Sequence, residues 1–323
     1  MKRARAVAAW GLAVLATAAL AVSSAAPPAP AREAFRARLA AQAPLLALAR
    51  AGDRLVAVGD FGVVLLSDDQ GRTWRQAASV AAREMLTSVT FVDPARGFAV
   101  GHGGTIIATT DGGEHWTRIH EAGADNVLLS VWFGNARTGV AVGAFGFAIA
   151  TADGGATWTP LTPGDGDDRD RHLNAIFAGP ADTLFVAAEA GTVFRSPDGG
   201  RSWTVLRLPY DGSFWGGMTL ADGTVLVWGM RGHVYRSADR GASWTEVPTG
   251  ATQSFAGGTL IADGAIVLVG LGGAVATSRD GGRTFRTELR KERQTYSAVA
   301  PGAPGQLAIA GLSGVSSLPM AAP

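Results

Sequence analysis

The residues with the clearest capacity for chemistry are six aspartates in turns of the form Ser/Thr-x-Asp-x-Gly-x-Ser/Thr followed by an aromatic residue, with His115 in place of the second hydroxyl residue in one of them. Carboxylates at suitable distances could serve as the acid and base of a glycoside hydrolase. An aspartate in such a turn, however, accepts hydrogen bonds from its own turn amides, which makes it a poor proton donor. We therefore interpret the turn as structural, with its glycine at positive φ and its ring packed between sheets. The aspartates are Asp69, Asp111, Asp153, Asp198, Asp239 and Asp280, and the aromatic residues are Trp74, Trp116, Trp158, Trp203, Trp244 and Phe285.

Metal chemistry has little support. The five histidines show no metal-ligand spacing. The acidic run at 165–170 places carboxylates at alternate positions, as a calcium site would, but it has Arg169 in its middle and no loop-closing glutamate. We expect no metal, no cofactor and no catalytic residue, and calcium at 165–170 stays open. The chain has no cysteine, so its core alone must hold an exported protein of this size.

The same turns reveal the architecture, because their aromatic ends lie 42, 42, 45, 41 and 41 residues apart. A glycine-closed hairpin tip precedes each turn, and a seventh tip stands at 311–314. A period of this length, with four short strands per repeat, predicts an all-β, seven-bladed propeller of antiparallel blades over 44–323. The seventh repeat begins at Tyr296 and lacks both the turn and a fourth strand. We expect residues 31–42 to supply that strand and close the ring.

The N-terminus reads as an export signal. Residues 1–26 combine Lys2, Arg3 and Arg5 with an apolar run and small residues at the end. Residues 27–43 follow as a proline-rich tether that contains the possible ring-closing strand. We expect a protein of the periplasm, or of the thylakoid lumen in a photosynthetic cell, that is monomeric and not inserted in the membrane after cleavage. Without residues 1–26 the balance of basic to acidic residues falls from 28:27 to 25:27, which does not indicate nucleic-acid binding.

Beyond the turn, which looks like the Asp-box or bacterial neuraminidase repeat, a longer pattern recurs. The second repeat shows it in the segments 86–93, 97–104 and 109–116, and 128–158 repeats it closely. This pattern resembles the photosystem II assembly and stability factor propellers. The resemblance implies an exported, non-catalytic propeller, with WD40/YVTN-like blades, that binds a membrane-protein complex during assembly. Propellers of this type also occur in bacteria without photosystem II, so an accessory role at an envelope (RND-type) transporter is the alternative.

In a four-stranded blade the hairpin tips and the connections between blades share one face, opposite the Asp-box turns. The tips vary in side chain from repeat to repeat, as expected of a protein-binding face. The connection 290–293 adds positive charge, and Arg83 and Arg207 could join it. The predicted partner-binding residues are Asp60, Phe61, His102, Phe145, Glu189, Met230, Arg231, Arg290 and Arg293.

A sialidase-like glycoside hydrolase is the contrasting class. That chemistry needs a three-arginine clamp, a Tyr/Glu nucleophile pair and an aspartic acid. Tyrosines occur only at 210, 235 and 296, and the segment 35–38 reads Phe-Arg-Ala-Arg instead of the Phe-Arg-Ile-Pro motif of sialidases. The repeats are also near the minimal blade length, which leaves little loop to build a pocket.

Overall fold

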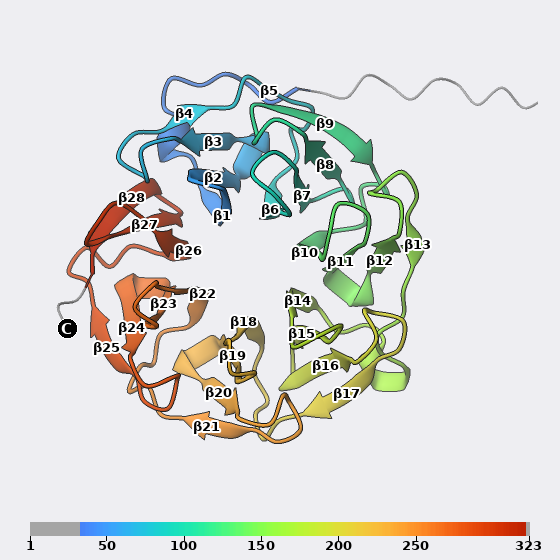
Figure 1. Ribbon diagram of the computed structural model, residues 1–323, viewed down its shortest axis with the longest axis vertical. Helices are drawn as coiled ribbons and strands as arrows, with labels where there is room; N and C mark the ends of the chain where they lie inside the picture. Colours follow the sequence, from blue (N-terminus) through green and yellow to red (C-terminus); the bar gives the residue numbers. More distant parts are fainter. Residues whose placement is uncertain (1–32, 321–323) are drawn as a thin grey trace, which may run out of the picture. The chain divides into compact units, whose positions relative to one another are not determined.

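The computed structural model describes residues 33–320, which form seven small sheets around a central axis (Figure 1). We call the sheets blades 1 to 7. In each blade consecutive strands pair antiparallel with the first strand innermost, apart from one short additional strand that pairs parallel on the outside of blade 2. The expected all-β, seven-bladed propeller is therefore confirmed. The predicted signal peptide, residues 1–26, lies outside the described residues.

The strands follow the repeat. Blade 1 has β1 (Leu45–Ala51), β2 (Arg54–Gly59), β3 (Val64–Ser67) and β4 (Arg75–Gln76), and blade 2 has β6 (Leu86–Phe91), β7 (Gly97–Gly101), β8 (Ile106–Thr109) and β9 (His115–His120), with β5 (Ser79–Val80) added outside. Blade 3 has β10 (Leu128–Phe133), β11 (Gly139–Gly143), β12 (Ala148–Thr151) and β13 (Thr159–Pro160), and blade 4 has β14 (Leu173–Ala178), β15 (Leu184–Ala188), β16 (Thr192–Ser196) and β17 (Thr204–Arg207).

The remaining blades repeat the plan. Blade 5 has β18 (Phe214–Thr219), β19 (Val225–Gly229), β20 (Val234–Ser237) and β21 (Thr245–Val247), blade 6 has β22 (Phe255–Leu260), β23 (Ile266–Gly270), β24 (Ala274–Ser278) and β25 (Arg286–Leu289), and blade 7 has β26 (Tyr296–Pro301), β27 (Gln306–Gly311) and β28 (Gly314–Pro319). The 3-10 turns are η1 (Ala40–Gln42), η2 (Asp60–Gly62), η3 (Ala144–Gly146), η4 (Gly166–Asp168), η5 (Met230–Gly232) and η6 (Leu271–Gly273).

The second strand of each blade is the most apolar, because both of its faces pack against neighbouring blades; β19 is buried along its whole length. Each first strand carries a register shift after its first residue, which is a β-bulge. At two bulges the extra residue reaches the next blade. Thr87 Oγ1 donates to Leu128 O at 2.6 Å, and Asn174 Nδ2 donates to Phe214 O at 2.8 Å. The bulges thus tie neighbouring blades together.

The six Asp-x-Gly turns share one hydrogen-bond pattern, which blade 3 illustrates. Thr151 Oγ1 donates to Asp153 Oδ1 at 2.8 Å and accepts from Gly155 N at 2.9 Å. The carboxylate also accepts from Thr157 N at 2.9 Å and from Thr157 Oγ1 at 2.6 Å. The hydrogen bonds from Thr157 lower the pKa of Asp153 to about 2. A carboxylate held in this way stays ionised and cannot act as a general acid near neutral pH.

Blade 2 lacks the second hydroxyl, and an imidazole replaces it. His115 Nδ1 lies 2.7 Å from Asp111 Oδ2, the position that a threonine or serine hydroxyl takes in the other turns. The turn pattern is therefore preserved despite the change of residue.

Each turn sends its aromatic side chain into the interface with the preceding blade. Trp116, for example, is 2% exposed and packs among residues of β2 and β3. Among the described residues, six of the seven interfaces hold such a ring: Trp116 (blades 1 and 2), Trp158 (2 and 3), Trp203 (3 and 4), Trp244 (4 and 5), Phe285 (5 and 6) and Trp74 (7 and 1).

The expectation that residues 31–42 close the ring as a strand is wrong for the described part of that segment. Residues 33–42 form no strand, and β28 is the outermost strand of a three-stranded blade 7. The segment instead runs along the outside of blades 1 and 2. There Gln76 Oε1 accepts from Ala37 N at 3.1 Å and Gln76 Nε2 donates to Phe35 O at 2.7 Å. These side-chain bonds take backbone groups that a β-ladder would have used.

The ring closes by packing. The short turn η1 contacts both β28 and β4, and Ala40 is buried in a cluster with Leu45 of blade 1 and Ala310 of blade 7. Arg50 Nη1 also donates to Pro301 O at 2.8 Å across the same seam. The first and last blades lie side by side in Figure 1, where blue and red strands meet.

Candidate binding face

The hairpin tips between the second and third strands are built alike. In each, the N–H of the residue after the second strand donates to the carbonyl that precedes the blade's first strand. Ala144 N, for example, donates to Val127 O at 2.9 Å. The preceding glycine is required because a Cβ on Gly143 would lie 1.9 Å from that oxygen. Blade 4 has Ala188 at this position, and its bond, from Glu189 N to His172 O, is the longest of the set at 3.3 Å.

Three tips hold a bulky residue in a strained conformation. Phe61, Phe145 and Arg231 have φ of 53°, 52° and 55°, the left-handed region that favours glycine. Gly103 and Gly272 stand at the same place in other blades. The left-handed conformation costs an L-residue about 1–2 kcal/mol. Strained bulky residues on exposed turns are candidates for function.

The connections between blades cross these tips. Gly146 N donates to Arg171 O at 2.9 Å and Gly273 N to Gln294 O at 2.6 Å, which brings tip and connection together. The Asp-x-Gly turns bond instead to the turns between first and second strands, as Gly154 N does to Arg137 O at 2.8 Å. Tips and connections therefore share one face, which we call the hairpin face, and the Asp-x-Gly turns lie on the other.

Two hollows mark the hairpin face. A hollow of about 310 Å³ adjoins Phe145, whose side chain is 70% exposed and whose ring centroid lies 4.5 Å from that of His172. A hollow of about 620 Å³ in blade 5 is lined by Tyr210, Met230 and Arg231, among others. Both hollows combine an aromatic ring with an arginine, which suits them to peptide recognition.

The other predicted residues are less available. Asp60 Oδ1 accepts from Phe61 N at 2.8 Å, and Glu189 Oε1 accepts from His172 N at 3.0 Å, so both carboxylates support local backbone. His102 and Arg293 are exposed on the hairpin face. The Arg290 side chain lies 4.0 Å from Glu288, at the rim of a different pocket between blades 6 and 7.

The two arginines expected to join the positive charge are engaged elsewhere. Arg83 Nε donates to Glu33 O at 2.7 Å, and its guanidinium lies 3.8 Å from the centre of the Phe35 ring. Arg207 Nη2 lies 2.6 Å from Asp168 Oδ2. These contacts hold the N-terminal segment and the loop after blade 3 in place.

Sequence reasoning missed Tyr210 and His172, which form walls beside the tips. Tyr210 OH donates to Met230 O at 2.9 Å, and the Tyr210 and His233 ring centroids are 4.4 Å apart. Burial raises the pKa of Tyr210, which keeps its hydroxyl a donor. Both residues could have been found from the sequence, because they lie on connections between blades, and these connections were already expected on the same face as the hairpin tips.

The acidic loop is arranged for arginines. Burial by itself would raise the pKa of Asp168, but hydrogen bonds from Arg171 and Arg207 lower it. Arg171 Nε lies 2.6 Å from Asp168 Oδ1. Across residues 33–320 no group of three or more acidic or histidine side chains is placed to hold a metal ion. In the same range, no helix has the length and apolar character needed to cross a bilayer.

The comparisons with known proteins agree on the fold. The family model of the photosynthesis system II assembly factor YCF48 matches residues 118–269, somewhat less than half of the chain. The solved structure of YCF48 bound to a D1 peptide aligns with a TM-score of 0.70 at 19% identity, covering 87% of this chain and 95% of that one. The chain resembles the photosystem II assembly factor propellers. The predicted resemblance is therefore confirmed.

Other solved propellers align comparably. YCF48 from Cyanidioschyzon merolae aligns with a TM-score of 0.67 at 16% identity, covering 85% of this chain and 94% of that one. An ancestral GH74 enzyme aligns with a TM-score of 0.66 at 13% identity, covering 92% of this chain but 46% of that one. At these identities the alignments establish the fold alone. No curated protein matches the chain in sequence.

Proposed function

We propose that this protein is a non-catalytic, exported binding factor that assists assembly of a membrane-protein complex and binds its partner through the hairpin face. The observation that carries the proposal is the set of bulky side chains, Phe61, Phe145 and Arg231, held in the left-handed conformation at exposed tips. Folding alone would be served better by glycine there. The strain is compensated if those side chains contact a partner.

The comparisons support this role. The family match at 118–269 spans blades 3 to 5, the first half of blade 6 and only the end of β9 in blade 2, and it includes the tips of Phe145 and Arg231. A solved relative in fold holds a peptide of D1. We infer that the partner is a photosystem II-like membrane protein, met in the thylakoid lumen or in the periplasm. An envelope transporter is the alternative partner and would use the same face.

Glycoside hydrolysis is the weaker reading, although a GH74 propeller shares the fold. The turn carboxylates are occupied by their own turns, as Asp153 shows. The tyrosines do not suit a nucleophile either. Tyr235 is 1% exposed, and burial together with Glu246 raises its pKa to about 12; Tyr296 is 2% exposed, and burial raises its pKa. A tyrosine nucleophile needs the opposite shift.

The test is affinity capture of the tagged mature protein from detergent-solubilised membranes of its source, with partners identified by mass spectrometry. We expect recovery of photosystem subunits, and loss of that recovery in a Phe61→Ala/Phe145→Ala/Arg231→Ala variant. The matched control is Arg72→Ala/Arg137→Ala, which changes exposed side chains without left-handed backbone on the opposite face. Recovery of a transporter would favour the alternative partner. Recovery unaffected by the tip substitutions would place the binding elsewhere on the protein.

A further inference from the structure

The interface between blades 6 and 7 is unlike the other six, because no turn aromatic from residues 33–320 enters it. In blade 5 the turn glycine Gly241 packs on Phe185 of β15, and in blade 6 Gly282 packs on Leu226 of β19. The repeat places Val267 of β23 at the equivalent position for blade 7, 41 residues after Leu226. Val267 therefore marks where a seventh ring would pack.

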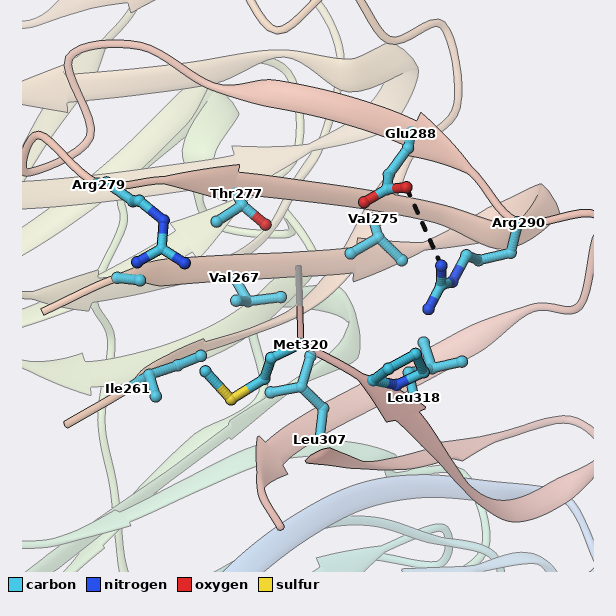
Figure 2. Close-up of a pocket in the computed structure, with 12 residues that line it drawn as sticks. Ile261, Val267, Val275, Thr277, Arg279, Glu288, Arg290, Leu307, Leu318 and Met320 are labelled. Carbon is cyan, nitrogen blue, oxygen red and sulfur yellow. Dashed lines mark ion pairs between the residues drawn. The ribbon is translucent and has the colours of Figure 1, made fainter. Parts of the chain in front are cut away.

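A pocket opens at that place (Figure 2). Val267 and Val275 of blade 6 and Leu307 and Leu318 of blade 7 line it with apolar surface. Met320 lies among them, half-buried, in the space that tryptophan or phenylalanine fills elsewhere. The cavity that remains is about 10 Å³, because the methionine occupies most of the site.

In the described part of the chain, the strand beside the pocket, β28, has no strand paired to its outer edge, and η1 packs at its start beside Gly314 and Val315. Met320 N donates to Gly305 O at 2.9 Å. Antiparallel ladders alternate, so residues 316 and 318 also bond to β27, while Val315 and Ser317 direct their backbone N–H groups outward. Ser316 and Ser317 are exposed, and no residue of 33–320 pairs with this edge. Blades 1 to 6 each have a fourth strand at this position.

The surroundings of the edge are basic. Residues 279–293 of blade 6 carry six basic and three acidic side chains, whereas β28 carries none of either. Arg279 and Arg290 flank the pocket in Figure 2, Arg279 beside Asp263 at 3.0 Å and Arg290 beside Glu288 at 4.0 Å. Arg286 and Lys291 are exposed nearby. An acidic occupant complements this charge.

We propose that an extended, acidic segment of a partner protein pairs with β28 as the fourth strand of blade 7 and inserts one aromatic or large aliphatic side chain against Val267, displacing Met320. Strand addition to a free sheet edge, with a pocket for one side chain, is an established mode of peptide recognition. The other six blade interfaces each hold a tryptophan or phenylalanine ring, which indicates the kind of side chain that fits between blades 6 and 7. This surface lies on the outer side of the ring and does not depend on the hairpin-face function proposed above.

The chain itself supplies the probe. The segment Gly241–Val247, Gly-Ala-Ser-Trp-Thr-Glu-Val, passes through the turn aromatic into the outer strand β21 of blade 5 and contains one acidic residue. A fluorescent peptide of this sequence, capped at both ends, is titrated against the full protein and followed by anisotropy. We expect saturable binding, weakened at least about tenfold by Trp244→Ser in the peptide and more modestly by Glu246→Lys. Hydrogen exchange should slow at the amides of Val315 and Ser317.

Two protein variants locate the site. Ser317→Pro removes an outward N–H without touching the bonds to β27, and it should abolish binding, whereas Ser317→Thr should preserve it. Met320→Trp fills the pocket with a side chain of the protein itself. In this variant the peptide with Trp244 and the peptide with Trp244→Ser should bind with equal affinity. Circular dichroism melts establish that each variant is folded.

Three outcomes overturn the proposal. One is a peptide that fails to bind wild-type protein at millimolar concentration. Another is equal binding to wild type and Ser317→Pro. The third is sedimentation that shows a dimer of wild type and a monomer of Ser317→Pro, because the edge would then pair with a second copy of the chain.

Discussion

At the residue scale, the same hydrogen bonds recur in the turns and hairpin tips of successive blades. Residues that depart from this pattern are candidates for another role. The turn aspartates are structural because hydroxyls and amides of their own turn surround them. The tip residues Phe61, Phe145 and Arg231 deviate in the opposite sense, since they keep a conformation that costs stability. Strain and exposure coincide at these three positions, which makes them the first targets for substitution.

Acid should weaken the fold through the turn aspartates. Hydrogen bonds hold the pKa values of Asp69, Asp153 and Asp198 at about 2, below the ordinary 3.8. Carboxyls whose pKa falls on folding stabilise the protein above the ordinary value, and that stability is lost as pH drops from about 4 to about 2. Asp153→Asn should therefore lower the melting temperature at pH 7, and its difference from wild type should vanish near pH 2.

Melts by circular dichroism between pH 2 and 7 test this. Asp53→Asn, on an exposed turn between β1 and β2, is the control and should behave as wild type. A constant difference between Asp153→Asn and wild type across the whole range would contradict the prediction.

Substitution by glycine should separate stability from binding at a tip. In Phe145→Gly the relief of about 1–2 kcal/mol of left-handed strain offsets the entropy cost of glycine, about 0.5–1 kcal/mol. The free energy of unfolding should stay within about 1 kcal/mol of wild type or rise, while partner capture falls. Phe145→Ala keeps the strain and should be less stable than Phe145→Gly. Urea unfolding measures the difference, and an unstable glycine variant would show that the ring serves the fold.

At the element scale, the blades are held together by rings at their interfaces more than by strand pairing between blades. Trp116 is nearly fully buried, and its Nε1 donates to Gly113 O at 2.9 Å. The interface between blades 5 and 6 has Phe285 in the same role, so the site accepts a smaller ring. The interface between blades 6 and 7 has Met320 in that place.

Trp116→Ala should lower the free energy of unfolding by about 3–5 kcal/mol, because it leaves a cavity between blades 1 and 2. Trp116→Phe retains most of the buried area and should cost markedly less. Urea denaturation followed by circular dichroism measures both variants. Equal losses would mean that the indole hydrogen bond, rather than packing, stabilises the interface.

At the scale of the whole ring, the described N-terminal segment acts as a belt over blades 7, 1 and 2. Gln76 bonds it at two backbone groups, and η1 packs at the seam. Gln76→Ala should lower the free energy of unfolding by about 1–2 kcal/mol, from two lost hydrogen bonds. It should also speed proteolysis near residues 33–39. Gln294→Ala, on an exposed connection, is the control. Unchanged proteolysis would mean that other contacts suffice to hold the belt.

The period and the turn glycines were enough to predict seven blades, because each repeat carries its own strand, tip and turn signals. The prediction of a ring-closing strand was wrong because side chains of other segments hold residues 33–42 in place. Gln76 and Arg83 donate hydrogen bonds to the backbone carbonyls of Phe35 and Glu33, and the repeat pattern gives no sign of these contacts. The two faces followed from topology, whereas the walls of the hollows did not, because Tyr210 approaches His233 only after blades 4 and 5 pack. Side-chain contacts between residues far apart in the sequence could not be predicted from the local repeat pattern.

The hydrogen bond from Arg50 to Pro301 joins residues 251 positions apart. A chain that emerges N-terminus first must complete blade 1 long before its neighbour in blade 7 exists, so the seam forms last. Until then the apolar face of blade 1 that later packs against blade 7 is exposed to solvent. The outer side of blade 1 is already covered by the N-terminal belt. Delay in synthesis should therefore expose one defined apolar surface, and chaperones that bind nascent chains should act on blade 1.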